Sequence, residues 1–389
     1  MKFLYIFLFF LFLITSCATV QNRTEEKSLQ NNTEGQNIKL LFAGDIMAHK
    51  PNFNMSNYEK IWDSIRDTVH SSDYAFANLE APVCNNLPYS SFPNFNMHDE
   101  YPEAAISAGF NVFSIINNHS NDQGLDGIKS TLNWADKIEQ QTASSNRPVY
   151  FSGLIENSGD HFSYRIIKKE NWTILFCAIT EILNRPTYKS YMNFVAPTEK
   201  EWKNFTQIIS QLRTNNPCDI FVLSIHTEEP EYVFEIDEKR RHYYYSLLDN
   251  GVDVLWTNHP HIPREKEIIG NKATQRLEKV IIYGNGNVIS GQRWEPDFEN
   301  PSNPRDHTGD AYLMEINFSK SEFEGKPFIN DYKTHFITTY INSNWEFIIK
   351  KLDDDFINYL AENGRPKWSK YIQERKKITE QTKETITWR

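Results

Sequence analysis

Residues 112–124, VFSIINNHSNDQG, decide how the rest of the sequence is interpreted. A run with strand character leads directly into Asn117, Asn118 and His119. Asparagine is common in turns that need unusual backbone dihedral angles, so one interpretation is a turn that closes a buried strand. The other is that the strand delivers an amide and an imidazole to a reaction site. The remainder of the chain decides between the two.

Strand-like and helix-like runs alternate around this stretch. The strand candidates are rich in Ile, Val, Phe and Tyr and are bounded by Gly, Asn, Asp or Pro. Helix candidates lie between them, at residues 58–70, 102–108, 125–141, 199–214 and 238–250. This alternation predicts an α/β domain with helices over the faces of its sheets. A hairpin connection at residues 168–173, KKENWT, indicates that the sheets are mixed.

Composition limits the class of protein. The 389 residues are 39% hydrophobic and 14% aromatic, which is ample for a large core. The formal net charge of -10 argues against nucleic acid as a partner, because binding to its backbone needs clustered Lys and Arg. The four cysteines, at positions 17, 84, 177 and 218, show no CxxC spacing, so neither a thiolate zinc site nor a disulfide framework is predicted.

The N-terminus carries a targeting signal. A lysine is followed by an apolar run over residues 3–14, which is typical of a secretory signal and short for a membrane span. Its end, LITSC, resembles a bacterial lipobox, in which the signal peptide 1–16 is removed and Cys17 is lipidated. This interpretation predicts an extracytoplasmic, membrane-anchored lipoprotein; a plain signal peptide and an uncleaved anchor are the alternatives.

The rest of the chain divides into three predicted parts. Residues 17–37 are polar without an apolar period, as in a flexible tether. The α/β pattern occupies residues 38–320 and weakens in a C-terminal extension, 321–389. Within that extension, residues 327–351 resemble extra strands, and the highly charged segment from Leu352 onward has helical character.

Polar and ionisable residues stand at five strand ends. They are Asp45, Glu80, Asn118 with His119, His226, and His259 with His261. In α/β sheets, ligands bind beyond the carboxyl ends of strands. Taken singly, each residue has another explanation, such as an Asp that caps the following helix. Together, carboxylate, amide and imidazole donors without a thiolate suit Zn²⁺, Mn²⁺ or Fe.

The pair His259 and His261 is the most specific local signal. In an extended segment, side chains two residues apart share a face, and Pro260 stiffens the backbone between them. We therefore expect both imidazoles to reach one metal centre, with a structural turn as the alternative.

Six segments, in order, resemble the motifs of a known family. They are AGDIM, ANLEAPV, GFNVFSIINNHSNDQG, VLSIH, TNHPHIP and IIYGNGNVI. The resemblance is to the CapA/PgsA family of poly-γ-glutamate capsule biosynthesis proteins, which is similar to the calcineurin-like metallophosphatase superfamily. It covers residues 38–318 and implies a four-layer α/β/β/α sandwich with two metals between its central sheets.

Carried over residue by residue, the resemblance implies a role for each strand end. Asp45, Glu80 and Asn118 would be metal ligands; His226 and His259 would complete one metal, and His261 the other. His119 would not be a ligand but would face the substrate, as general acid or electrostatic clamp. Two divalent cations would stabilise an in-line displacement at phosphorus, and a neighbouring histidine would protonate the leaving oxygen.

Four further residues are candidates for supporting roles. Asp122 would orient His119, and Asn287 would brace the site through its Asn–Gly turn. His98 and Arg264 could each contact an anionic substrate, and for both the alternative is an ordinary structural role.

Two departures from the superfamily pattern leave the function open. Met47 stands where the superfamily has a histidine, and thioether sulfur is a poor ligand for these cations. His49 is a possible substitute, and Glu80 replaces the usual Asp. One hypothesis is a metal-dependent phosphoesterase-type hydrolase that acts in synthesis, export or processing of a surface polymer. The alternative is a non-catalytic accessory subunit of a capsule synthase that binds metal and an anionic polymer; a purely structural lipoprotein is a third.

Overall fold

The computed structural model describes residues 37–159, 162–321 and 325–389. The predicted signal peptide, the predicted lipidation site Cys17 and the predicted tether up to residue 36 lie outside the described residues. Within the described part of the chain, no helix combines the length and the apolar character that a membrane crossing requires.

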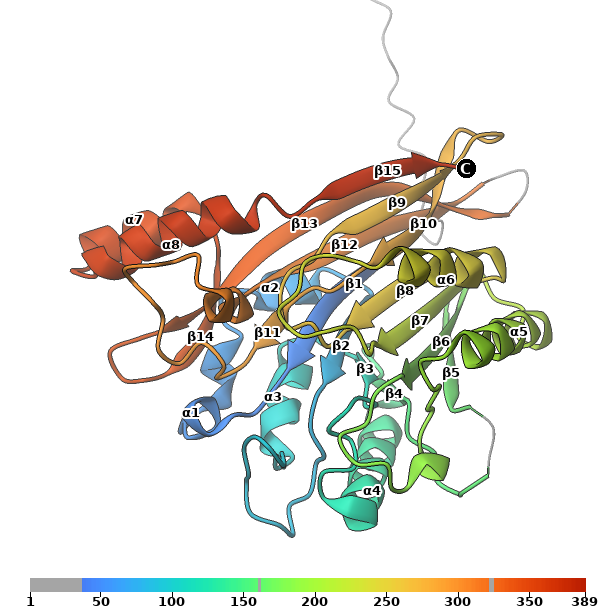
Figure 1. Ribbon diagram of the computed structural model, residues 1–389, viewed down its shortest axis with the longest axis horizontal. Coiled ribbons are helices and arrows are strands. Elements are labelled where there is room, and N and C mark those ends of the chain that lie inside the picture. The colour runs from blue at the N-terminus through green and yellow to red at the C-terminus, as the bar shows by residue number, and fades with distance from the viewer. Residues whose placement is uncertain (1–36, 160–161, 322–324) are drawn as a thin grey trace, which may run out of the picture. The chain divides into compact units, whose positions relative to one another are not determined.

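Strands make up the centre of the molecule (Figure 1). They are β1 (Asn37–Ile46), β2 (Tyr74–Leu79), β3 (Val112–Ser114), β4 (Tyr150–Ser152), β5 (Tyr164–Lys169), β6 (Trp172–Thr180), β7 (Ile220–His226), β8 (Val254–Asn258), β9 (Lys266–Asn271), β10 (Arg276–Ile282), β11 (Asn287–Ile289), β12 (Asp310–Lys320), β13 (Pro327–Ile341), β14 (Phe347–Lys351) and β15 (Glu384–Trp388).

Helices lie between the strands in sequence. The α-helices are α1 (Lys50–Phe53), α2 (Arg66–His70), α3 (Glu100–Ser107), α4 (Gly124–Thr142), α5 (Glu199–Asn215), α6 (Glu238–Asp249), α7 (Asp354–Glu362) and α8 (Pro366–Thr379). Three short 3₁₀ helices are η1 (Tyr58–Ile61), η2 (Lys189–Tyr191) and η3 (Pro304–Gly309).

The strands are hydrogen-bonded in the order β4-β3-β2-β1-β12-β13-β10-β8-β7-β6-β5. Pairing is parallel within β1–β4 and within β6, β7, β8 and β10. It is antiparallel where β12 joins β1 and β13, and in the β5–β6 hairpin. The predicted hairpin at residues 168–173 is this β5–β6 turn, and the prediction of mixed sheets is confirmed.

The sheet consists of two halves that pack face to face. Among the described residues, named strands of the two halves pair with each other only at Leu277 on β10 and Ile329 on β13. Trp256 of β8 packs against both Phe42 and Phe76 of the other half, with ring centroids 6.0 and 6.2 Å apart. Its indole N–H donates to the carbonyl oxygen of Ala43 at 2.8 Å. These contacts form the apolar layer between the halves.

Helices cover the two outer faces (Figure 1). Alternation along β6 places Phe176 inward and Leu175 outward, where Leu175 joins a core cluster with Phe205 of α5 and Leu247 of α6. On the other half, Trp134 of α4 meets Phe151 of β4, with centroids 5.0 Å apart. The predicted α/β fold with four layers, α/β/β/α, is therefore confirmed.

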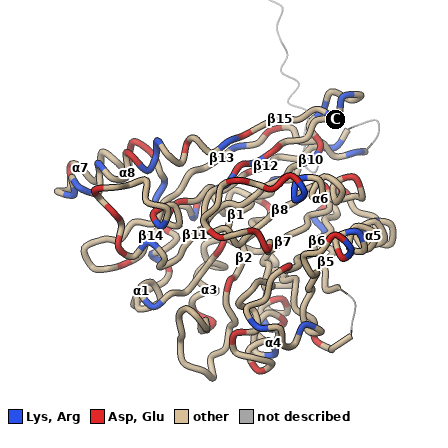
Figure 2. Tube along the Cα trace, viewed as in Figure 1, with Lys and Arg blue, Asp and Glu red and all other residues tan. Residues whose placement is uncertain are grey.

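The C-terminal residues take part in the same sheet. The expected extra strands at 327–351 are β13 and β14, and β13 pairs with β12 along most of its length. The expected helices are α7 and α8, which pack on each other, and β15 then adds to β9 in parallel. Figure 2 shows Lys and Arg interspersed with Asp and Glu along the whole described trace.

Candidate functional site

The strand-end residues converge where the carboxyl ends of the two halves meet. Asp45 lies at the end of β1, Glu80 directly follows β2, and Asn118 follows β3. From the other half, His226 ends β7 and His259 directly follows β8. All five are buried, with at most 4% of each residue exposed. The convergence expected from the strand-end pattern is thus present in the structure.

A close backbone approach brings β1 into this position. The Asp45 N–H donates to the Gly286 carbonyl oxygen at 3.1 Å, and Asp45 is paired with Asn287 of β11. A Cβ atom on Gly44 would lie 1.7 Å from that same oxygen. Only glycine therefore lets β1 press against the turn that carries Asn287.

Two groups of three side chains have the geometry to hold a cation. One contains Asp45, Glu80 and His226, and the other contains Glu80, His259 and His261. Within each group, the candidate ligand atoms lie within 4.8 Å of one another. Glu80 belongs to both groups, so its carboxylate is a candidate ligand common to both. The resemblance implied a different division, with His226 and His259 on one metal.

The backbone at His259 and His261 is not extended, contrary to the sequence-based expectation. Their φ angles are 102° and 59°, both in the left-handed region that non-glycine residues rarely adopt. The expected proximity nevertheless holds, because this turn leaves the two ring centroids 5.6 Å apart. A non-glycine residue with a left-handed backbone is strained, and strain of this kind is common at functional sites.

Neighbouring polar groups hold these side chains. The His261 Nδ1 atom lies 2.9 Å from Asn287 Oδ1 and 3.2 Å from Asp45 Oδ2. The Asn287 amide in turn donates to the Ser290 hydroxyl, to Gln292 Oε1 and to the Thr308 carbonyl. On the opposite side, His226 Nε2 lies 3.0 Å from Asn118 Oδ1. The predicted bracing residue Asn287 therefore lies directly against a candidate ligand.

The electrostatics of the cluster suit a bound cation. Burial, then the charges of Asp45 and Glu231, raise the pKa of Glu80 well above its ordinary value. Burial and nearby imidazoles lower the pKa of both His226 and His259. Burial also lowers the pKa of His261, but its hydrogen bond to Asp45 and the charge of that carboxylate outweigh burial and raise it overall. The lowered pKa values keep His226 and His259 in the neutral form that binds divalent metals, and a bound cation would favour the ionised form of Glu80.

Buried polar atoms without hydrogen-bond partners also indicate a bound cation. Among the described residues, Glu80 Oε1, His259 Nδ1 and Asn78 Oδ1 are buried without a hydrogen-bond partner. Buried polar atoms normally have partners, and an ion is one explanation for such exceptions. With no thiolate in the set, nitrogen and oxygen donors fit Mn²⁺, Zn²⁺ or Fe.

His119 lies beside the cluster but outside both groups. Its Nδ1 atom is 2.7 Å from Asp122 Oδ2, and that carboxylate also accepts the Phe95 N–H at 2.7 Å. Asn117 accepts the backbone N–H of His119 and donates to the Leu79 carbonyl. Asp122 and Asn117 thus hold the imidazole and its turn in one orientation.

Three other predicted residues belong to neither of the two groups. His98 contacts the Leu87 carbonyl at 2.8 Å and packs on Tyr89. Arg264 donates to Glu229 Oε1 at 2.9 Å and to the Glu235 carbonyl. None of these contacts involves a member of the two groups. They are the contacts expected if His98 and Arg264 have ordinary structural roles. His49 is outside both groups as well, and Met47 belongs to the hydrophobic core.

Two asparagines at the site had not been predicted. Asn78 Nδ2 donates to Asp45 Oδ1 at 2.8 Å and lies 3.4 Å from Glu80 Oε2. Asn78 lies on β2, two residues before Glu80, and residues two apart in an extended segment share a face. This spacing could have identified Asn78 as a site residue. Asn184 Nδ2 lies 3.1 Å from His119 Nδ1. Asn184 belongs to an irregular segment after β6, where no sequence period indicates a direction.

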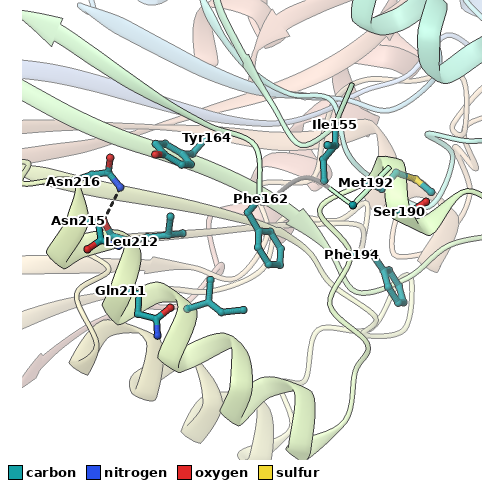
Figure 3. A pocket seen from close by; sticks show the side chains of 12 residues that line it. Ile155, Phe162, Tyr164, Ser190, Met192, Phe194, Gln211, Leu212, Asn215 and Asn216 are labelled. Carbon is teal, nitrogen blue, oxygen red and sulfur yellow. Dashed lines mark hydrogen bonds between the residues drawn. The ribbon is translucent and has the colours of Figure 1, made fainter. Parts of the chain in front are cut away.

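A separate hollow lies away from this cluster. It has a volume of about 720 Å³ and is bounded by Phe162, Tyr164 and Met192 on one side and Leu212 of α5 on the other (Figure 3). None of its lining residues belongs to either group of candidate ligands.

Comparisons with known proteins relate the chain to capsule synthesis. The family model described as "Bacterial capsule synthesis protein PGA_cap" matches residues 39–292. The PGA biosynthesis protein CapA of Bacillus subtilis is 24% identical over 265 residues, which cover 66% of this chain and 64% of that protein. The capsule biosynthesis protein CapA of Bacillus anthracis is 22% identical over 296 residues, covering 72% and 66%. The chain thus spans just under two thirds of the length of both relatives.

A solved structure of the calcineurin-like phosphoesterase YfkN from Bacillus subtilis is also similar. Its sequence identity is 9% and its TM-score 0.39, with coverage of 87% of this chain and 99% of that one.

Proposed function

The chain belongs to the PGA_cap family of bacterial capsule synthesis proteins, and from that premise we propose that it is a metal-dependent phosphoesterase-type hydrolase. Its task would be the synthesis, export or processing of a surface polymer such as poly-γ-glutamate. The observation that carries this proposal is the placement of Glu80 in two candidate ligand groups, with a separately held His119 beside them.

The proposed site divides its work among residues of this chain. Asp45, Glu80 and His226 would hold one divalent cation, and Glu80, His259 and His261 a second, with Asn118 as a further ligand beside His226. When bound, two such cations supply Lewis-acid stabilisation for displacement at phosphorus. Mn²⁺, Zn²⁺ and Fe suit these donors.

His119 is proposed as the general acid. Its Nδ1 faces Asp122, so Nε2 is the nitrogen left to exchange a proton with the substrate. Protonation of the leaving oxygen by a positioned imidazole is an effective form of acid catalysis. Asp122 would hold the ring orientation and stabilise the imidazolium.

A non-catalytic accessory subunit is the second candidate. It is favoured by Met47, a core residue at the position where the similar superfamily has a metal-binding histidine. Such a subunit would use the same cluster to bind metal and an anionic polymer, next to a capsule synthase, without turnover.

Metal removal and readdition test the first proposal. We expect the purified protein to contain divalent metal and to hydrolyse an aryl phosphate or an aryl phosphodiester, to lose this activity in EDTA and to regain it with Mn²⁺. Metal content is measured by mass spectrometry and hydrolysis by release of the coloured phenol. Metal-loaded protein without turnover would favour the accessory role. Unchanged metal content in both His226→Ala and His259→Ala would refute the proposed centre itself.

We also propose that the protein is an extracytoplasmic lipoprotein anchored to the membrane through Cys17. Support comes from the LITSC segment after the apolar run. Cells that express the protein and are fed a radiolabelled fatty acid should label the wild type, and Cys17→Ala should abolish the label. Equal labelling of both proteins would exclude this anchor.

A further inference from the structure

His49 is a buried imidazole next to the proposed site that belongs to neither ligand group. It directly precedes α1, four residues after Asp45, and only 9% of it is exposed. Its Nδ1 accepts the backbone N–H of Gly291 at 3.3 Å. A Cβ atom on Gly291 would lie 2.7 Å from the His49 Cβ, so the approach depends on glycine at that position.

The Gly291 contact fixes the tautomer of His49. A nitrogen that accepts a hydrogen bond carries no hydrogen, so the hydrogen of the neutral ring sits on Nε2. Burial, followed by the proximity of His261 and His119, lowers the pKa of His49 to about 3, in agreement with a neutral ring. Among the residues that the structure describes, no hydrogen-bond partner meets Nε2.

Phe95 contacts both His49 and His119, the proposed general acid. The Phe95 ring meets the His49 ring edge to face at 4.9 Å and the His119 ring at 4.6 Å. The backbone N–H of Phe95 is itself bound by Asp122. Phe95 therefore separates the two imidazoles and holds both against rotation.

The site needs donors for an anionic substrate. Within residues 37–159, 162–321 and 325–389, the ion pairs of Asp45 and Glu80 involve only imidazoles, with no Lys or Arg. Arg264, the predicted anion contact, is bound to Glu229. Neutral N–H groups are one means of holding phosphoryl oxygens that the cations would leave uncovered.

We propose that His49 is a substrate-contacting residue whose Nε2–H donates to a non-bridging oxygen of a phosphoryl group in this site. The inference rests on the proposed phosphoester chemistry, because it names the donor for that substrate class. His49 thus has a different role from the metal ligand expected at this position: it recognises the anion and leaves the cations to the two ligand groups.

The full-length protein and two variants test this role, with inorganic phosphate as the probe. His49→Phe retains a ring against Phe95 but has no N–H, whereas His49→Gln places an amide N–H near Nε2. We expect His49→Phe to weaken phosphate binding to the Mn²⁺-loaded protein about tenfold, the usual effect of one hydrogen bond to a charged group. His49→Gln should recover part of that affinity, and bound Mn²⁺ should be unchanged in both.

A matched substitution and a direct spectrum complete the test. His242→Phe makes the same change on exposed α6, away from the cluster, and should leave phosphate affinity unchanged. In wild-type protein loaded with Zn²⁺, the ¹H–¹⁵N signal of the His49 Nε2–H should shift when phosphate is added. This measurement uses the wild-type protein, so it does not depend on whether a variant folds.

Each outcome separates this inference from the proposed function. Loss of bound Mn²⁺ in both His49 variants, unchanged phosphate affinity in His49→Phe, or a wild type that binds Mn²⁺ but not phosphate would overturn the role of His49. If the wild type hydrolyses no phosphoester, yet phosphate affinity falls in His49→Phe alone, the inference stands and the proposed hydrolase does not. If hydrolysis is present and kcat/KM falls with phosphate affinity, both are supported.

Discussion

Replacement of His119 by alanine is expected to lower kcat for phosphoester hydrolysis by about 10²–10⁴, the usual contribution of a positioned acid or base. Bound metal should not change, because His119 lies outside both ligand groups. The measurement is a comparison of kcat for an alkyl phosphate ester, whose leaving oxygen needs a proton, with the metal content of the same sample. This combination distinguishes a proton donor from a ligand, whose removal would lower both.

The leaving group provides a sharper readout for His119. A phenol with a low pKa departs without protonation, so the loss in His119→Ala should be smallest for activated aryl phosphates and largest for alkyl esters. Asp122→Asn is the matched control: it keeps an oxygen that can accept the Phe95 N–H but weakens the orientation of His119. We expect kcat for phosphoester hydrolysis to fall about 10–100-fold in this variant. A His119→Ala protein that has lost its metal would show that His119 is a ligand instead.

The strand ends of the site could be predicted because they follow from topology. Asp45, Glu80 and Asn118 lie at or after the ends of parallel strands of one half, and His226 and His259 at or after the ends of parallel strands of the other. Parallel strands end at the same edge of a sheet, so polar residues at their ends meet whatever the details of packing. The sequence pattern supplied both the strands and those residues.

The remaining features depend on loop conformation, which no period encodes. The rings of His259 and His261 come together through a left-handed turn and not through the expected extended segment. His49 is turned by its contact with Gly291, which lies 242 positions away in sequence. Arg264 looked available for an anion, but Glu229 lies close enough to bind it. These outcomes are set by tertiary contacts and not by neighbours in sequence.

The second large effect is expected at Glu80, the side chain common to both ligand groups. Glu80→Gln preserves shape but removes the charge that two cations would share, so bound metal should fall from about two ions per chain to near zero. His226→Gln and His259→Gln each alter one group and should lose about one ion. Metal content after dialysis, measured for all three variants, gives the comparison. A Glu80→Gln protein that retains as much metal as the wild type would exclude a shared centre.

Stability should change in the opposite direction to metal binding in Glu80→Gln. Without metal, burial and the charge of Asp45 raise the pKa of Glu80 in the folded state well above its ordinary value. A raised carboxyl pKa contributes stability that is fully present below the unfolded pKa and is lost as pH rises through the folded pKa. In EDTA at neutral pH, Glu80→Gln should therefore unfold at a higher temperature than the wild type, and the difference should disappear near pH 4. Added Mn²⁺ should reverse the order, because a ligand at 100 times its Kd stabilises the wild type by about 2.7 kcal/mol. A variant that is less stable than the wild type in EDTA would show that the Glu80 charge is balanced within the protein and does not await a cation.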